Sequence, residues 1–128
     1  MVIASDLEAA RQIEQILLDE VCRYGYNDAA AFSIRLALEE GLINAIKHGN
    51  SYDPNKIVEV LFDITPQRVA ISITDQGRGF DPSAVPDPRT DENIDKPCGR
   101  GIMLMRAFMD DVQYNCRGNQ VRMVKHNL

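Results

Sequence analysis

Hydrophobic residues near the start of the chain recur at the spacing of one helix face. The residues that share this face are Leu7, Ala10, Ile13, Leu17 and Val21. This spacing predicts an amphipathic helix that buries one side. Ser5 or Asp6 can cap its beginning, and Tyr24-Gly25-Tyr26-Asn27 is expected to end it.

The following segment predicts a second helix. Asn27 or Asp28 can cap its start, and Gly49-Asn50 is expected to stop it. The residues expected to face the core are Phe32, Leu36, Leu42 or Ile43, and Ile46. A polar stripe in its second half is expected to face elsewhere.

After this helix, the spacing of hydrophobic residues changes from a helical period to the alternation that is typical of a strand. Strands are predicted from Lys56 to Ile64 and from Arg68 to Asp75, joined at Pro66-Gln67. The apolar residues that alternate are Val58, Val60, Phe62 and Ile64 in the first strand, and Val69, Ile71 and Ile73 in the second. Strict alternation indicates a sheet with one buried face.

The last third of the chain begins with a change of composition. Residues 81–97 are rich in proline and aspartate, which predicts a long loop, and long loops in small domains are usually functional or disordered. Ile102 to Met109 is apolar on almost every side and predicts a core helix. Val112 to Cys116 and Gln120 to His126 then predict a hairpin about Arg117-Gly118-Asn119. The expected fold is one α/β (α+β) domain over 1–128, a two-layer sandwich with helices on one face of a mixed, mainly antiparallel sheet.

Composition and charge narrow the range of functions that the chain can have. The chain has 128 residues, 45% of them hydrophobic, and a formal net charge of -5. A negative chain is a poor binder of nucleic acid, whose affinity rests on clustered lysine and arginine. No apolar run approaches a membrane span, and we expect a cytoplasmic protein with protein or small-molecule partners. The cysteines Cys22, Cys98 and Cys116 lack metal-ligand spacing and are expected to be structural thiols.

The most informative segment is Glu40-Gly41-Leu42-Ile43-Asn44-Ala45-Ile46-Lys47-His48-Gly49. In a helix, Glu40, Asn44 and His48 share one face, with Lys47 beside them. A carboxylate, an amide, an ammonium and an imidazole within an otherwise apolar segment predict a small polar site.

Two glycine motifs follow. Asp75-Gln76-Gly77-Arg78-Gly79 comes after a predicted strand, where the aspartate can form an Asx turn or hold a ligand at the rim of a pocket. Gly99-Arg100-Gly101 comes before an apolar helix, where backbone N–H groups can bind an anion such as phosphate or simply begin the helix.

In this order the three motifs resemble the GHKL (Bergerat) ATP-binding family, whose boxes read E-x-x-x-N-A-x-x-H-G, D-x-G-x-G and G-x-G. Within that family the chain looks most like the bacterial anti-sigma factor serine kinases. Phe108-Met109-Asp110-Asp111-Val112 and Lys125-His126 also resemble that subgroup. The resemblance implies a Bergerat-type, histidine-kinase-like ATPase domain that binds ATP and Mg²⁺, with an ATP lid at about 81–98.

The resemblance also implies roles for residues of the first motif. Asn44 corresponds to the asparagine that holds magnesium, and Glu40 to the proposed catalytic base. Lys47 and His48 are expected to support the nucleotide site, although a solvated lysine and a structural histidine are the ordinary alternatives.

The glycine motifs correspond to the rest of the nucleotide site. Asp75 matches the aspartate that accepts a hydrogen bond from the adenine amino group, and Gly77 and Gly79 match the glycines that let the base approach. The residues expected near phosphate are Gly99, Arg100, Gly101 and Ile102.

Taken together, the resemblance predicts an anti-sigma-factor-type serine/threonine protein kinase in a partner-switching system that regulates transcription. Its expected partners are a STAS-type anti-sigma factor antagonist and a sigma factor or other regulatory protein, and a homodimer is also expected. The alternatives are a non-catalytic, nucleotide-dependent binding module and a detached histidine-kinase catalytic domain. A third, an ATPase that drives a conformational machine, would need a transducer domain that this length does not provide.

Overall fold

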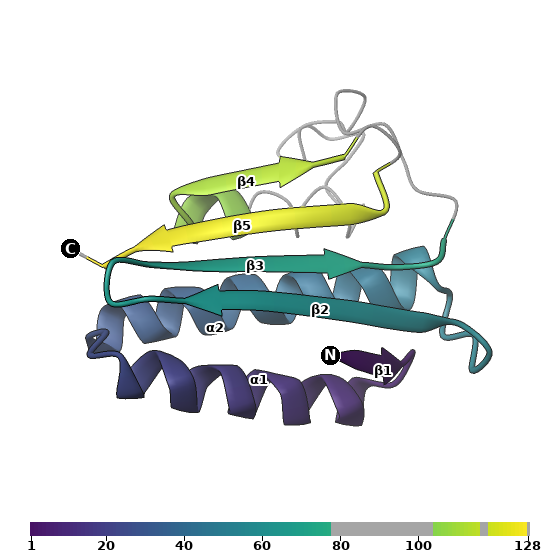
Figure 1. Ribbon diagram of the computed structural model, residues 1–128. Coiled ribbons are helices and arrows are strands. Elements are labelled where there is room, and N and C mark those ends of the chain that lie inside the picture. Colours follow the sequence, from purple (N-terminus) through teal and green to yellow (C-terminus); the bar gives the residue numbers. More distant parts are fainter. Residues whose placement is uncertain (78–103, 116–117, 128) are drawn as a thin grey trace.

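Helices lie on one side of a five-stranded sheet in the computed structural model, which describes residues 1–77, 104–115 and 118–127 (Figure 1). The strands are β1 (Val2–Ala4), β2 (Ile57–Ile64), β3 (Arg68–Thr74), β4 (Asp111–Tyr114) and β5 (Gln120–His126). Their spatial order is β1-β2-β3-β5-β4, and each pair of these described strands is antiparallel. The predicted two-layer α/β fold is confirmed.

Helix α1 (Leu7–Arg23) packs over β1 and β2 at the edge of the sheet (Figure 1). Its cap is Asp6, whose carboxylate accepts the N–H of Glu8 at 3.0 Å. The predicted core positions that are buried are Ala10, Ile13, Leu17 and Val21. Leu7, by contrast, is 36% exposed and lies outside the core.

Helix α2 (Asp28–Ile43) packs over β3 and β5, and Asn27 caps it by accepting the N–H of Ala30 at 2.8 Å. The prediction that Phe32 faces the core is wrong, because this side chain is 51% exposed and meets Phe108 edge to face. The buried residues of α2 are Ile34, Ala37, Leu38, Gly41 and Leu42. Apolar residues occur on nearly every side of this helix, so its pattern alone does not define which side is buried.

The buried side of α2 packs closely against the sheet. A Cβ atom at Gly41 would lie 2.7 Å from Cδ1 of Ile73, which is closer than real Cβ contacts. The glycine therefore lets the Ile73 side chain of β3 lie close to the helix backbone, on the side of α2 where Ile34 and Leu38 are also buried.

The predicted alternation of β2 and β3 is confirmed. Val60 pairs with Ile73 and Phe62 with Ile71, and the buried residues of these two strands include Val58, Val60, Val69, Ile71 and Ile73. Both predicted strands are one residue shorter in the structure. Strand β1 was not predicted, because three residues are too few to show a period; its register is set by backbone pairing of Ile3 with Val58.

The C-terminal hairpin is also confirmed, with Gly118 in the turn at φ 79°. Residues 104–108 are helical, and Met105 and Met109 are buried. Leu104 is 41% exposed, so this helix is less completely buried than its sequence suggests. Among the described residues, no helix is both long and apolar enough to cross a membrane.

Candidate nucleotide site

The segment with the asparagine motif is not a simple continuation of α2. From Asn44 to Gly49 the chain forms a π-helix, η1 (Asn44–Gly49), so the prediction of one α-helix up to Gly49 is wrong in its last turn. The N–H of Asn50 donates to the carbonyl of Ala45 at 2.9 Å, which closes the wider π-type turn. Single π-helical turns inside helices are frequent at functional sites.

The backbone directly after η1 is strained. Ser51 and Tyr52 have φ values of 52° and 57°, in the left-handed region that side chains other than glycine rarely adopt. Such residues cost roughly 1–3 kcal/mol each and persist only where their surroundings hold them. Here the N–H of Tyr52 donates to the carbonyl of Ile46 at 2.9 Å, and this hydrogen bond holds the strained residues against η1.

The asparagine motif and the D-x-G motif are in direct contact. A Cβ atom at Gly49 would fall onto the carboxylate of Asp75, 2.6 Å from its Oδ1. A Cβ atom at Gly77 would fall onto the backbone of Gly49, 2.8 Å from its Cα. Two glycines are therefore required where the end of η1 meets the loop after β3. The structure brings together two motifs that are more than twenty-five residues apart in the sequence.

Asp75 is anchored where β3 ends. Its N–H donates to the carbonyl of Asn119 at 2.9 Å, and its own carbonyl accepts the side-chain amide of Asn119 at 3.1 Å. Its Oδ1 accepts the N–H of Gly77 at 2.8 Å, so the Asx turn is present. A carboxylate offers several acceptor positions, and an Asx turn is compatible with a bond to a ligand.

Glu40 lies near the end of α2, Asn44 is the first residue of η1 one helical turn further on, and both are half-buried. Burial raises the pKa of Glu40 above its ordinary value, and the nearby Glu39 carboxylate raises it further. Within the described part of the chain, the side-chain amide of Asn44 has no hydrogen-bond partner. Its oxygen is therefore available to a ligand.

Lys47 and His48 differ in their surroundings. Lys47 is exposed, whereas His48 is half-buried. Burial lowers the pKa of His48, and the Lys47 ammonium lowers it further, so both favour the neutral imidazole. A neutral imidazole can donate one hydrogen bond and accept another.

Several predicted site residues lie outside the described residues. These are Gly79, Gly99, Arg100, Gly101 and Ile102, together with the expected lid at about 81–98. The geometry of the site therefore rests on η1, the end of α2 and the loop after β3.

Sequence reasoning missed three residues beside this contact. Asn50, Ser5 and Gln76 form a hydrogen-bonded cluster that holds the loop after β3. From its place in the sequence, Asn50 is expected only to stop the helix. No local spacing could reveal the cluster, because its members come from three distant segments.

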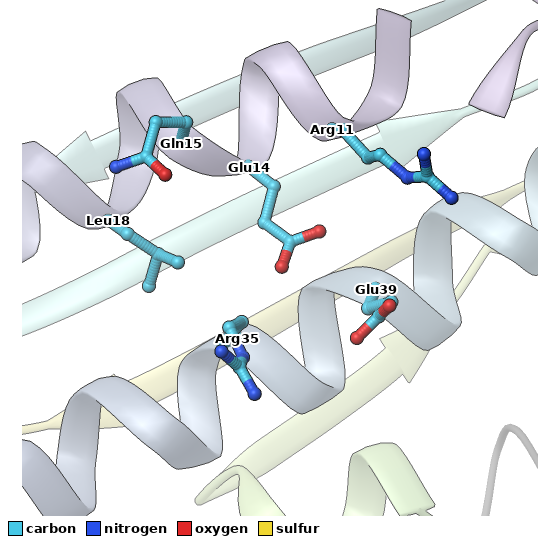
Figure 2. Close-up of a pocket in the computed structure, with 6 residues that line it drawn as sticks. All are labelled: Arg11, Glu14, Gln15, Leu18, Arg35 and Glu39. Atoms are coloured by element: carbon cyan, nitrogen blue, oxygen red, sulfur yellow. The ribbon is translucent and has the colours of Figure 1, made fainter. Parts of the chain in front are cut away.

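A separate cavity of about 420 Å³ lies between α1 and α2 (Figure 2). Its lining residues are Arg11, Glu14, Gln15, Leu18, Arg35 and Glu39. None of the predicted site residues lines it. Glu39 connects it electrostatically to the site, because its charge raises the pKa of both Glu14 and Glu40, although burial is the larger cause for each.

The donor atoms fit a magnesium ion that arrives with a nucleotide. The described residues contain no cluster of three or more histidine, cysteine or acidic side chains that could hold a metal. Mg²⁺ in nucleotide sites takes one or two protein oxygens and completes its shell with phosphates and water. The Asn44 oxygen meets that requirement.

Two known proteins have similar sequences. Serine-protein kinase RsbW of Staphylococcus epidermidis is 34% identical over 102 residues, which cover 72% of this chain and 63% of that protein. The same-named protein of Staphylococcus aureus strain Newman is 32% identical over 100 residues, with the same coverage. The matched region thus spans less than two thirds of the length of these relatives.

Solved structures show the same fold. The RsbU and RsbW domains of a Mycobacterium tuberculosis protein match with a TM-score of 0.61 and 16% identity, covering 99% of this chain and 31% of that one. The histidine kinase domain of a blue-light activated kinase from Erythrobacter litoralis matches with a TM-score of 0.52 and 17% identity, covering 77% and 45%. The sequence pattern of the histidine kinase-like ATPase domain matches residues 3–125. This chain therefore belongs to the histidine kinase-like ATPase domain family, the GHKL type.

Proposed function

We propose that this protein is an ATP-dependent serine/threonine protein kinase that phosphorylates an anti-sigma factor antagonist. The observation that carries the proposal is the contact of Gly49 with Asp75 and Gly77, which joins the two described motifs of a nucleotide site. Relatives named serine-protein kinase support the choice of a protein hydroxyl as acceptor.

In this proposal each described residue has one role. Asp75 accepts a hydrogen bond from the adenine amino group, and the glycines beside it give the base room. Asn44 holds Mg²⁺, which would neutralise phosphate charge. His48, whose neutral form is favoured by burial, supports the binding site by hydrogen bonding, and exposed Lys47 can contact phosphate from the solvent side.

Glu40 is the proposed base for phosphoryl transfer. The acceptor hydroxyl oxygen bonds to the terminal phosphorus, the bond from that phosphorus to the bridging oxygen breaks, and ADP leaves. The hydroxyl proton passes to the Glu40 carboxylate. A base works best when its pKa approaches the operating pH, and burial moves the pKa of Glu40 in that direction.

The proposed partners come from the resemblance to the anti-sigma factor serine kinases and not from the site. The proposed acceptor is a serine or threonine on a STAS-type antagonist, and the proposed regulatory target is a sigma factor or a comparable protein. The unphosphorylated antagonist would sequester the kinase, and phosphorylation would release it to hold its target. Homodimerisation is part of this proposal.

Phosphate transfer from labelled ATP tests the proposal. The wild type is incubated with Mg²⁺ and candidate antagonists from the same genome, with Asn44→Ala beside it. We expect an acid-stable phosphate on serine or threonine, lost in Asn44→Ala. Acid-labile phosphate would indicate a histidine kinase, and tight ATP binding without any transfer would indicate a nucleotide-dependent binding module.

A further inference from the structure

Asn50 is completely buried, and its side-chain amide bonds to three different segments. Its Oδ1 accepts the N–H of Gln76 at 2.8 Å, and its Nδ2 donates to the carbonyl of Ile57 at 2.9 Å and to Oγ of Ser5 at 3.0 Å. A backbone N–H can only donate and a carbonyl can only accept, so these partners determine the orientation of the amide.

The neighbours of Asn50 reinforce this connection. Gln76 is held a second time, because its side-chain oxygen accepts the N–H of Ile57 at 2.8 Å. Ser5 is also buried and donates to the carbonyl of Lys56 at 2.8 Å. The beginning of β2 and the residue between Asp75 and Gly77 are thus tied to one buried amide.

The position of Asn50 links this cluster to the proposed nucleotide site. Asn50 follows Gly49 directly, and Gln76 lies between Asp75 and Gly77, the two residues that press against Gly49. The bond from Gln76 to Asn50 therefore fixes how the loop after β3 lies on η1. A shift of this loop would move the Asp75 carboxylate, whose Oδ1 is itself bonded to the N–H of Gly77.

We propose that Asn50 is a positioning residue that acts through Gln76 to place the Asp75 carboxylate for recognition of the adenine base. This inference rests on the proposed nucleotide-binding function and deepens it. Adenine carries an amino group where guanine carries a carbonyl oxygen, and a carboxylate can only accept hydrogen bonds. Correct placement of Asp75 should therefore produce selectivity for ATP over GTP.

Equilibrium binding of ATP, GTP and inorganic triphosphate tests the role of Asn50. Asn50→Ala should raise the Kd for ATP at least tenfold and change the Kd for triphosphate less than threefold, so that the preference for ATP over GTP falls. Because the phosphate contacts do not involve the loop after β3 in this proposal, only recognition of the base should be weakened.

A matched control separates positioning from general loss of stability. Tyr26→Phe removes another hydrogen bond of a buried side chain, the one from the tyrosine hydroxyl to the carbonyl of Thr65 at 2.8 Å, in the turn between β2 and β3. Both variants should melt at lower temperatures than the wild type. Only Asn50→Ala should lose the ATP preference, with binding measured well below both melting temperatures.

Each outcome of the binding experiment either supports or overturns the proposed role of Asn50. An ATP/GTP preference within twofold of the wild type in folded Asn50→Ala overturns the inference and leaves the proposed function intact. If Asn50→Ala does not fold, Asn50→Ser carries the test, because it also removes the amide oxygen that accepts the backbone N–H of Gln76; the expected loss of preference is at least threefold, and an unchanged preference overturns the inference. A wild type that binds neither ATP nor triphosphate overturns both the inference and the proposed function.

Discussion

Replacing Gly77 by alanine should weaken ATP binding without unfolding the protein. The new Cβ would lie 2.6 Å from the carbonyl carbon of Gly49 and 2.8 Å from its Cα. Carbon atoms in contact are normally about 3.5–4.0 Å apart, so the two backbone segments must separate by about 1 Å. Neither atom belongs to a flexible side chain that could turn away.

The size of the effect follows from this overlap. Overpacking of this kind costs typically about 1–3 kcal/mol. The overlap is relieved when the loop after β3 moves away from η1. This movement opens the contact between Gly77 and Gly49, which forms part of the proposed nucleotide site. If ATP binding has to restore this contact against that cost, the Kd for ATP should rise by roughly 5- to 150-fold.

Isothermal titration with Mg-ATP measures the change, and thermal unfolding is recorded in parallel. Gly25→Ala is the matched control: Gly25 has φ 84° and open space around its missing Cβ, far from the site. This control should lose about 1–2 kcal/mol of stability through backbone strain and keep the wild-type Kd. Unchanged ATP affinity in Gly77→Ala would refute the claim that the Gly49 contact belongs to the nucleotide site.

Three further predictions concern charge and burial. Glu39→Gln removes a negative charge, so the pKa of Glu40 should fall and the acidic limb of the phosphotransfer pH profile should move to lower pH. Lys47→Gln should raise the pKa of His48 toward its ordinary value, as measured by NMR titration, and an unchanged or lower pKa would contradict the assignment. Phe32→Ala should lower the free energy of unfolding by only about 1 kcal/mol in chemical denaturation, because the ring is exposed; a loss of about 3–5 kcal/mol would mean that it is buried.

The parts of the fold that the sequence predicts well are those with a sharp contrast between apolar and polar positions. The buried positions of α1 from Ala10 to Val21 and the alternation of β2 and β3 were predicted correctly for this reason. In α2 the contrast is weak, and the buried side is the one on which Gly41 lies close to Ile73 of the sheet. A contact between residues that are distant in the sequence cannot be read from local periodicity.

The candidate site shows the same limit. The motifs identified Glu40, Asn44 and Asp75 as candidates, but not the π-helical turn, because a change of hydrogen-bond register leaves no pattern of residue types. The role of Asn50 depends on partners that are 26 and 45 residues away. Its signal in the sequence is no more than an asparagine after a glycine, which is also typical of an ordinary helix end.

The rate of phosphate transfer in a single turnover tests the central claim most directly. Glu40→Gln is compared with Glu39→Gln, a neighbour of the same chemistry that faces the cavity between α1 and α2 (Figure 2). The account predicts that Glu40→Gln keeps its affinity for ATP and transfers phosphate about 10²- to 10⁴-fold more slowly, the usual contribution of a general base. Glu39→Gln should stay within a few-fold of the wild type at its own pH optimum. Transfer by Glu40→Gln at the wild-type rate would contradict the claim that the Glu40 carboxylate takes the proton.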